Sequence, residues 1–170
     1  MIHDFTMVLK GHIALERAIF PKETSGVQLD ALARLPLWRE GKDYKHGTGH
    51  GVGCFGNVHE GPNRISNKGS MYGFKANMVT SIEPGYYKEN AYGIRIENLV
   101  YSKPSKKYEN FLEFETLTLV PIDKKLIDVY LLDAGEQDWL NNYHRKVYES
   151  LAACVNDDEK KWLKESCSPL

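Results

Sequence analysis

The stretch that decides the fold is Met78–Tyr101, which reads MVTSIEPGYYKENAYGIRIENLVY. Its two halves, 78–87 and 92–101, are rich in β-branched and aromatic residues, and four residues, Lys88–Ala91, separate them. Two such runs joined by a short polar segment are typical of an antiparallel hairpin. The sequence therefore predicts a pair of antiparallel strands at the centre of the fold.

Two carboxylates lie inside these runs. A turn centred on Asn90 sets Tyr87 opposite Gly93. The same register sets Glu83 opposite Glu97, with Cβ atoms about 4.5–5.5 Å apart. At this spacing two negative charges repel unless a cation lies between them. The pair indicates a cation site, provided that the proline after the first glutamate adds no bulge.

Three histidines lie upstream in glycine-rich sequence. His46 and His50 belong to HGTGHGVG at 46–53, and His59 belongs to NVHEGP at 57–62. Glycine costs about 1 kcal/mol in a helix interior, so we expect a loop or an irregular strand here. Surface histidines on a turn are the alternative interpretation. An imidazole beside two carboxylates suits a divalent metal ion, which can lower the pKa of bound water and polarise a carbonyl.

Composition limits the classes of function. The 170 residues carry 22 basic and 23 acidic side chains, with no basic block to contact nucleic acid or a membrane surface. Cys54, Cys154 and Cys167 form no Cys-x-x-Cys pair, which favours a reducing, cytosolic setting, and Cys54 is interpreted as a small packing residue. No apolar run reaches 18 residues, and charges within the first 20 argue against a signal peptide.

Two amphipathic segments precede the histidines. Apolar spacing predicts a helix over 4–20, which Pro21 would end, and a second helix over 28–38. Pro36 should break or kink the second helix, because proline lacks the N–H that a helix interior needs.

The segments after the hairpin predict one strand and two helices. Alternation over 111–121 indicates the strand. Asp133 and Glu136 have the spacing of a capping box before a helix that reaches about residue 151. A short helix over 159–164 would pack Trp162 and Leu163. Since no repeat or linker is visible, we expect a single domain.

The motifs closely resemble Xaa-Pro aminopeptidase (aminopeptidase P), a member of the pita-bread metallopeptidase family. Four motifs occur in the family's order, and the likeness covers most of the chain and fits the cytosolic eukaryotic type best; the motifs are 46–53, 57–62, 83–87 and 93–98. The resemblance implies an α+β pita-bread fold with a curved antiparallel sheet and flanking helices. Residues 1–170 would form a single partial domain, the C-terminal part of the catalytic domain.

The resemblance also implies a pair of manganese ions held by five ligands. His50, Glu83 and Glu97 match three of them, and Glu83 would also assist the bridging hydroxide. The other two ligands are aspartates that lie upstream of the position of Asp4, and this chain starts after them. We therefore expect the 170 residues alone to bind manganese weakly or not at all and to be inactive.

Three further site residues follow from the resemblance. His59 would stabilise the tetrahedral intermediate, and His46 would line the proline side of the substrate pocket, so that both are candidate catalytic and substrate-binding residues. Arg95 would support the site beside the last ligand, although a plain ion pair is the alternative. Tyr86 and Tyr87 are interpreted as packing aromatics.

The implied reaction releases the N-terminal residue from a peptide whose second residue is proline. The alternatives are a prolidase-type dipeptidase, a methionine aminopeptidase, or a metal-free pita-bread module that binds peptides or proteins. Such a module would be expected to lack residues such as His50 or Glu97. The expected partners are the peptide and a second copy in a homodimer, in the cytoplasm, without nucleic acid or membrane.

Overall fold

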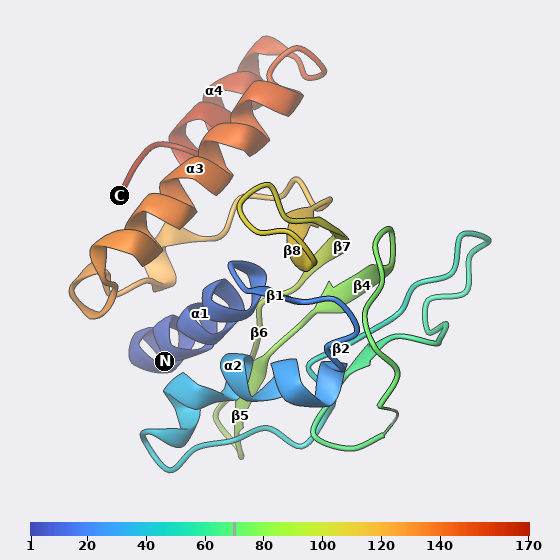
Figure 1. The fold of residues 1–170 in the computed structure, drawn as a ribbon. Helices are drawn as coiled ribbons and strands as arrows, with labels where there is room; N and C mark the ends of the chain where they lie inside the picture. Colours follow the sequence, from blue (N-terminus) through green and yellow to red (C-terminus); the bar gives the residue numbers. More distant parts are fainter. Residues whose placement is uncertain (70) are drawn as a thin grey trace. The chain divides into compact units, whose positions relative to one another are not determined.

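The computed structural model of the chain describes residues 1–69 and 71–170 (Figure 1). It contains two compact units. The first, which we call the helical unit, comprises Met1–Thr6 and Leu119–Leu170. The second, the sheet unit, comprises Met7–Thr118. Each unit is described by itself below.

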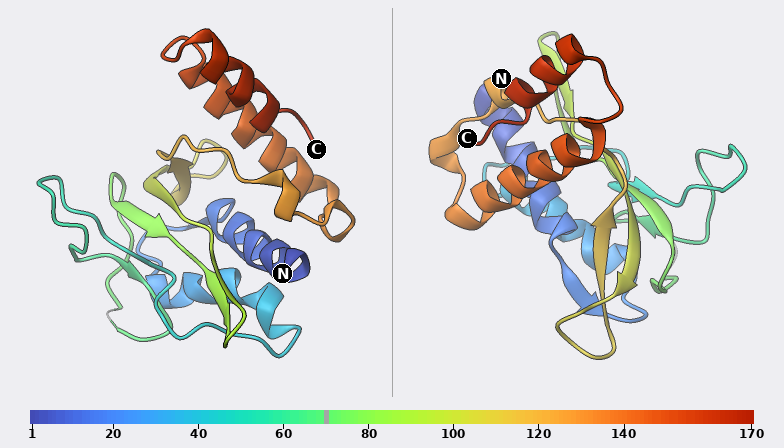
Figure 2. Two further views of the ribbon diagram at one scale, coloured as in Figure 1. Left: turned by 180° about the vertical axis from the view of Figure 1, so that it is seen from behind. Right: turned by 90° about the horizontal axis from the view of Figure 1, so that it is seen from above.

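The sheet unit is built on an antiparallel sheet of four strands in the order β1-β8-β7-β4. These strands are β1 (Ile19–Pro21), β4 (Val79–Ile82), β7 (Asn98–Pro104) and β8 (Phe111–Thr116). Two short antiparallel pairs accompany it: β2 (Gly49–His50) with β3 (Arg64–Ile65), and β5 (Gly85–Lys88) with β6 (Tyr92–Arg95). The segment between β2 and β3 extends away from the helices of this unit (Figures 1 and 2).

Helix α2 (Gly26–Trp38) and the part of helix α1 (Ile2–Glu16) that follows Thr6 contribute the other side of the core. They cross closely, because a Cβ on Gly11 would lie 2.0 Å from the carbonyl oxygen of Ala33. Three aromatic rings fill the space against the strands, with centroids 5.1–5.9 Å apart; they belong to Phe20, Phe74 and Phe114. Helices and antiparallel strands thus form the predicted α+β arrangement.

Several predicted boundaries are wrong. The first helix ends at Glu16, and Phe20 lies in β1, where it pairs with Leu112 of β8. Pairing along a sheet edge therefore overrides the helical spacing of the sequence. Pro36 lies inside the last turn of α2 without ending it. The strand expected over 111–121 ends at Thr116.

The helical unit contains α3 (Ala134–Leu151), α4 (Asp157–Ser166) and two 3₁₀ turns, Lys124–Leu126 and Val129–Leu131. The predicted capping box is confirmed, since Asp133 accepts from the Glu136 N–H and the Glu136 side chain accepts from the Asp133 N–H. Leu163 is buried as predicted, but Trp162 is 62% exposed and does not pack. Within the described ranges, no helix has the length and apolar character needed to cross a membrane.

His144 of α3 is buried in the helical unit in its neutral form. Its Nε2 accepts from the backbone N–H of Ile122 at 3.0 Å, and Nδ1 has no hydrogen-bond partner among the residues that the structure describes. Burial and the nearby charge of Lys124 lower the pKa of His144 to about 4. A proton on Nε2 would also face the N–H of Ile122.

This histidine should make the stability of the chain depend on pH. The unfolded chain binds a proton at His144 near pH 6.5, whereas the folded chain binds it near pH 4, so stability is full above pH 6.5 and falls as the pH is lowered towards 4. We expect a loss of about 2 kcal/mol between pH 7.5 and 5 in urea unfolding. His144→Gln should remove this loss, and His3→Gln, which changes an exposed histidine, should keep it. Parallel pH curves for the wild type and His144→Gln would contradict the assignment.

Candidate active site

The two predicted carboxylates lie at the junction of two strand pairs in one register. On one side Ile82 pairs with Asn98, and on the other Gly85 pairs with Arg95. The residue numbers of every pair sum to 180, so Pro84 adds no bulge, and its carbonyl oxygen accepts from Ile96 N at 3.2 Å. The predicted register is confirmed, and it sets Glu83 opposite Glu97.

His50 is carried to the same place by β2, which lies against β4. The backbone N–H of His50 donates to Ser81 Oγ at 3.0 Å, and its carbonyl oxygen accepts from Thr80 Oγ1 at 2.9 Å. The close approach needs glycine next to it, because a Cβ on Gly49 would lie 1.9 Å from the carbonyl oxygen of Ser81. The imidazole Nε2 of His50 then lies 3.2 Å from Glu83 Oε1.

Three potential ligand atoms converge here. One atom each from His50, Glu83 and Glu97 lies within 4.8 Å of the other two. His50 Nδ1 is 3.0 Å from the carbonyl oxygen of Gly51, which can only accept, so Nδ1 carries the hydrogen. In the neutral imidazole the lone pair of Nε2 therefore faces a carboxylate oxygen. Because two acceptors at this distance repel, the donor set fits a cation between them.

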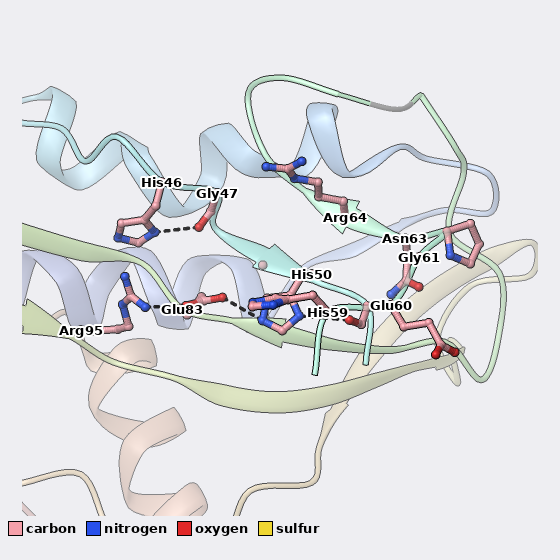
Figure 3. Close-up of a pocket in the computed structure, with 13 residues that line it drawn as sticks. His46, Gly47, His50, His59, Glu60, Gly61, Asn63, Arg64, Glu83 and Arg95 are labelled. Atoms are coloured by element: carbon pink, nitrogen blue, oxygen red, sulfur yellow. Dashed lines mark hydrogen bonds and ion pairs between the residues drawn. The ribbon is translucent and has the colours of Figure 1, made fainter. Parts of the chain in front are cut away.

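The site opens into a cavity of about 570 Å³ (Figure 3). Five of the predicted residues line it: His46, His50, His59, Glu83 and Arg95. His59, on the loop between β2 and β3, is exposed, and its ring centroid lies 4.3 Å from that of His50. Glu97 does not line the cavity, but one of its carboxylate oxygens lies within 4.8 Å of ligand atoms of His50 and Glu83. The sequence motifs thus meet in one place.

A chain of hydrogen bonds links Glu83 to His46. Arg95 Nη1 donates to Glu83 Oε2 at 3.0 Å, and its Nε and Nη2 donate to the Tyr87 hydroxyl at 3.0 and 2.7 Å. That hydroxyl lies 2.9 Å from His46 Nε2, while His46 Nδ1 lies 2.8 Å from the carbonyl oxygen of Gly47. Since the carbonyl oxygen of Gly47 can only accept, His46 carries its hydrogen on Nδ1, and Tyr87 donates to Nε2.

This chain changes the interpretation of two residues. Arg95 is more than a neighbour of Glu97, because it holds Glu83 directly. Burial alone would lower the pKa of Arg95, but the Tyr87 hydroxyl and the two glutamates raise it, so the guanidinium stays charged. Tyr87 is 46% exposed, and its hydroxyl connects two site residues, so the interpretation as a packing aromatic is wrong. Cys54 is exposed and does not pack either.

A buried polar cluster lies behind Glu97. Asn98, the next residue, directs Nδ2 to His12 Nε2 and to Glu16 Oε2 of α1, each at 3.2 Å. Glu16 also accepts from the Thr116 hydroxyl. Burial raises the pKa of Glu16, but His12 and the hydrogen bonds outweigh this and hold it below its ordinary value. Strand β7, which begins directly after Glu97, is thereby anchored to α1.

Two ranges of the chain match known protein families. Residues 1–104 match metallopeptidase family M24, and residues 110–170 match the C-terminal region of the same peptidases. The chain belongs to metallopeptidase family M24. Two regions of one peptidase family thus follow each other along these 170 residues.

Several relatives of this M24 chain are aminopeptidases. It is 47% identical over 173 residues to Aminopeptidase P2 of Arabidopsis thaliana. The matched region covers 98% of this chain and 24% of the plant protein. The crystal structure of X-prolyl aminopeptidase from Caenorhabditis elegans, described as a cytosolic enzyme with a di-nuclear active site, matches at a TM-score of 0.94 and 46% identity. That match covers 99% of this chain and 29% of the nematode chain.

Prolidase from Pyrococcus furiosus is more distant. It matches at a TM-score of 0.58 and 31% identity, over 69% of this chain and 32% of the prolidase. The resemblance to aminopeptidase P and the predicted pita-bread fold are confirmed by these comparisons. The M24 chain spans less than a third of the length of each of these relatives.

Proposed function

We propose that the M24 chain forms part of a metal-dependent aminopeptidase that releases the N-terminal residue from peptides with proline in second position. The observation that carries the proposal is the convergence of ligand atoms of His50, Glu83 and Glu97 within 4.8 Å beside a cavity. The names of the relatives support the choice of reaction. A metal-free binding module would not need to retain these three residues.

The proposed metal ligands are His50, Glu83 and Glu97. A divalent ion bound there supplies a water of lowered pKa and a polarised carbonyl group. Glu83 has the further task of accepting the proton of the attacking water. Its hydrogen bond to Arg95 at 3.0 Å supports the ligand role, because it fixes one carboxylate oxygen and leaves the other directed towards His50.

The two other histidines are proposed to act on the substrate. His59, exposed on its loop beside His50, can donate a hydrogen bond to the oxygen that gains charge at the scissile carbonyl. His46 is proposed to line the part of the cavity that receives the proline ring. The bond between Tyr87 and His46 Nε2 supports a fixed ring orientation for that contact.

We further propose that the site holds two manganese ions and that two aspartates from outside these 170 residues complete the set of ligands. Three ligands without the remaining two leave an open site, so the chain alone should bind manganese weakly and be inactive. The expected location is the cytoplasm. Large exposed apolar side chains, among them Trp38, Phe55 and Trp162, support self-association as a homodimer.

The test compares this chain with an extended protein that continues upstream through both aspartates. Each is given manganese, a tripeptide with proline in second position and an Xaa-Pro dipeptide. Metal content is measured by mass spectrometry, and light scattering gives the oligomeric state. We expect two tightly bound ions and tripeptide cleavage for the extended protein, and neither for the chain alone, because only the extended protein has the full ligand set.

The other outcomes separate the alternatives. Cleavage of the dipeptide but not of the tripeptide would identify a prolidase-type dipeptidase. An extended protein that binds no metal and cleaves neither peptide would indicate a binding module. Tight binding of two ions by the 170 residues alone would contradict the proposed role of outside ligands.

A further inference from the structure

A buried ion pair on α2 is hydrogen-bonded to the segment 43–48, which contains His46. Arg34 is fully buried, and Asp30, one turn earlier, is 1% exposed. Arg34 Nε and Nη2 donate to the two carboxylate oxygens of Asp30 at 2.5 and 3.2 Å. Removing two charges from water costs several kcal/mol per ion, and a hydrophobic pair would often serve the core as well. A buried pair of this kind is therefore a candidate for a specific role.

All five N–H groups of Arg34 are used. Besides Asp30, Nη1 donates to Asp43 Oδ1 at 2.8 Å and to the carbonyl oxygen of Tyr44 at 2.6 Å, and Nη2 donates to the carbonyl oxygen of His46 at 2.9 Å. The guanidinium also lies 3.9 Å from the centroid of the Tyr44 ring. Burial lowers the pKa of Arg34, but Asp30, Tyr44 and Asp43 raise it, so the charge is retained.

Asp30 holds the same segment at a second point. Its Oδ1 accepts from Thr48 Oγ1 at 2.5 Å, and Thr48 Oγ1 in turn contacts the Tyr44 hydroxyl at 2.5 Å. Residues 43–48 form no regular helix or strand, so few other backbone hydrogen bonds fix them. Hydrogen bonds from Arg34 and Asp30 thus hold this segment, which lacks the backbone hydrogen bonds of a helix or strand.

The segment held in this way leads directly into the candidate active site. His46, whose carbonyl oxygen Arg34 holds, contacts the Tyr87 hydroxyl through Nε2. Two residues later, the carbonyl oxygen of Thr48 accepts from the backbone N–H of Glu83 at 2.7 Å. Helix α2 itself contributes no residue to the lining of the cavity. Its connection to the site therefore runs through these bonds.

We propose that Arg34 and Asp30 are positioning residues that fix the ring of His46 relative to Glu83, and so set how tightly the substrate's second residue binds. This rests on the proposed peptidase function. Lysine offers three donors from one atom and cannot hold two carbonyl groups and a forked carboxylate together. Arg34→Lys keeps the buried charge but should release the carbonyl oxygen of His46.

The test uses Arg34→Lys in two proteins. In the extended protein loaded with manganese, the KM for the proline tripeptide should rise about tenfold, with kcat and metal content within twofold of the wild type. In the 170-residue chain, nitrogen-15 NMR of the imidazole rings should show His46 losing its single Nδ1–H tautomer, while His50 keeps its own. Arg39→Lys, an exposed arginine at the end of α2, is the matched control.

A second variant covers the case in which Arg34→Lys does not fold. Thr48→Val removes the bond to Asp30 without leaving a buried charge unpaired, and it should change KM and the His46 signal in the same direction. A folded Arg34→Lys chain with the His46 signal and KM of Arg39→Lys would overturn the inference. If the unaltered extended protein cleaves neither peptide, the proposed function fails, and the NMR result alone still decides whether Arg34 positions His46.

Discussion

Glu83→Gln should lower the kcat/KM of the extended protein for the proline tripeptide by about 10³-fold or more. A positioned general base contributes roughly 10²–10⁴-fold, and the same carboxylate is also a proposed metal ligand. Glutamine keeps the size of the side chain but has one acceptor oxygen instead of two. It cannot accept from Arg95 with one oxygen and direct a second, charged oxygen towards His50, as Glu83 does at 3.0 and 3.2 Å.

The control for this change is Glu109→Gln. Glu109 is exposed in the turn between β7 and β8, so the kcat/KM of the Glu109→Gln variant should remain within twofold of the wild type. Initial rates with the tripeptide and metal content by mass spectrometry are measured together, since loss of the ligand should also lower manganese retention. More than a tenth of wild-type activity in Glu83→Gln, with both metal ions retained, would exclude Glu83 as base and ligand.

The position of Glu83 opposite Glu97 could be predicted because a hairpin is a local structure. A short turn fixes the register, and the side-chain period of two then determines every later pair. The structure keeps this register through Pro84, whose missing N–H is not needed at the junction between β4 and β5. Local rules therefore reached both carboxylates of the candidate site.

Contacts between residues that lie far apart in the sequence could not be predicted from local patterns. Phe20 continues the helical spacing of its segment, yet it lies in β1 because β8, some ninety residues later, offers a pairing edge. Arg34 has the pattern of an ordinary charged residue on an amphipathic helix. Its burial depends on Asp43 and two carbonyl groups of a segment without regular structure. No periodicity in the sequence carries such contacts.

The same limitation applies to the path that brings His50 to the carboxylates. Strands β2 and β3 have two residues each, which is too short for a recognisable alternation. What the sequence does contain is glycine at the contact with β4. The second prediction tests whether that glycine is required.

Gly49→Ala should destabilise the chain by about 3 kcal/mol or more, because overpacking a close contact forces the backbone apart. The added Cβ would lie 1.9 Å from the carbonyl oxygen of Ser81 and 3.0 Å from its carbonyl carbon, and neither can move without shifting β4. The displacement would also separate His50 from Glu83. Urea unfolding of the 170-residue chain measures the loss of free energy.

Gly47→Ala, two residues earlier, is the matched control. A Cβ there would meet Ile65 O and Ser66 Cβ at 3.5 Å, an ordinary contact distance, and Gly47 does not have a positive φ. Replacing glycine with alanine where the backbone permits it reduces the entropy of the unfolded chain and stabilises by about 0.4–1 kcal/mol. The two substitutions should therefore have opposite signs. If the free energy of unfolding of Gly49→Ala lies within about 1 kcal/mol of the wild type, which is the net contribution of one hydrogen bond, then β2 does not need this close approach to β4.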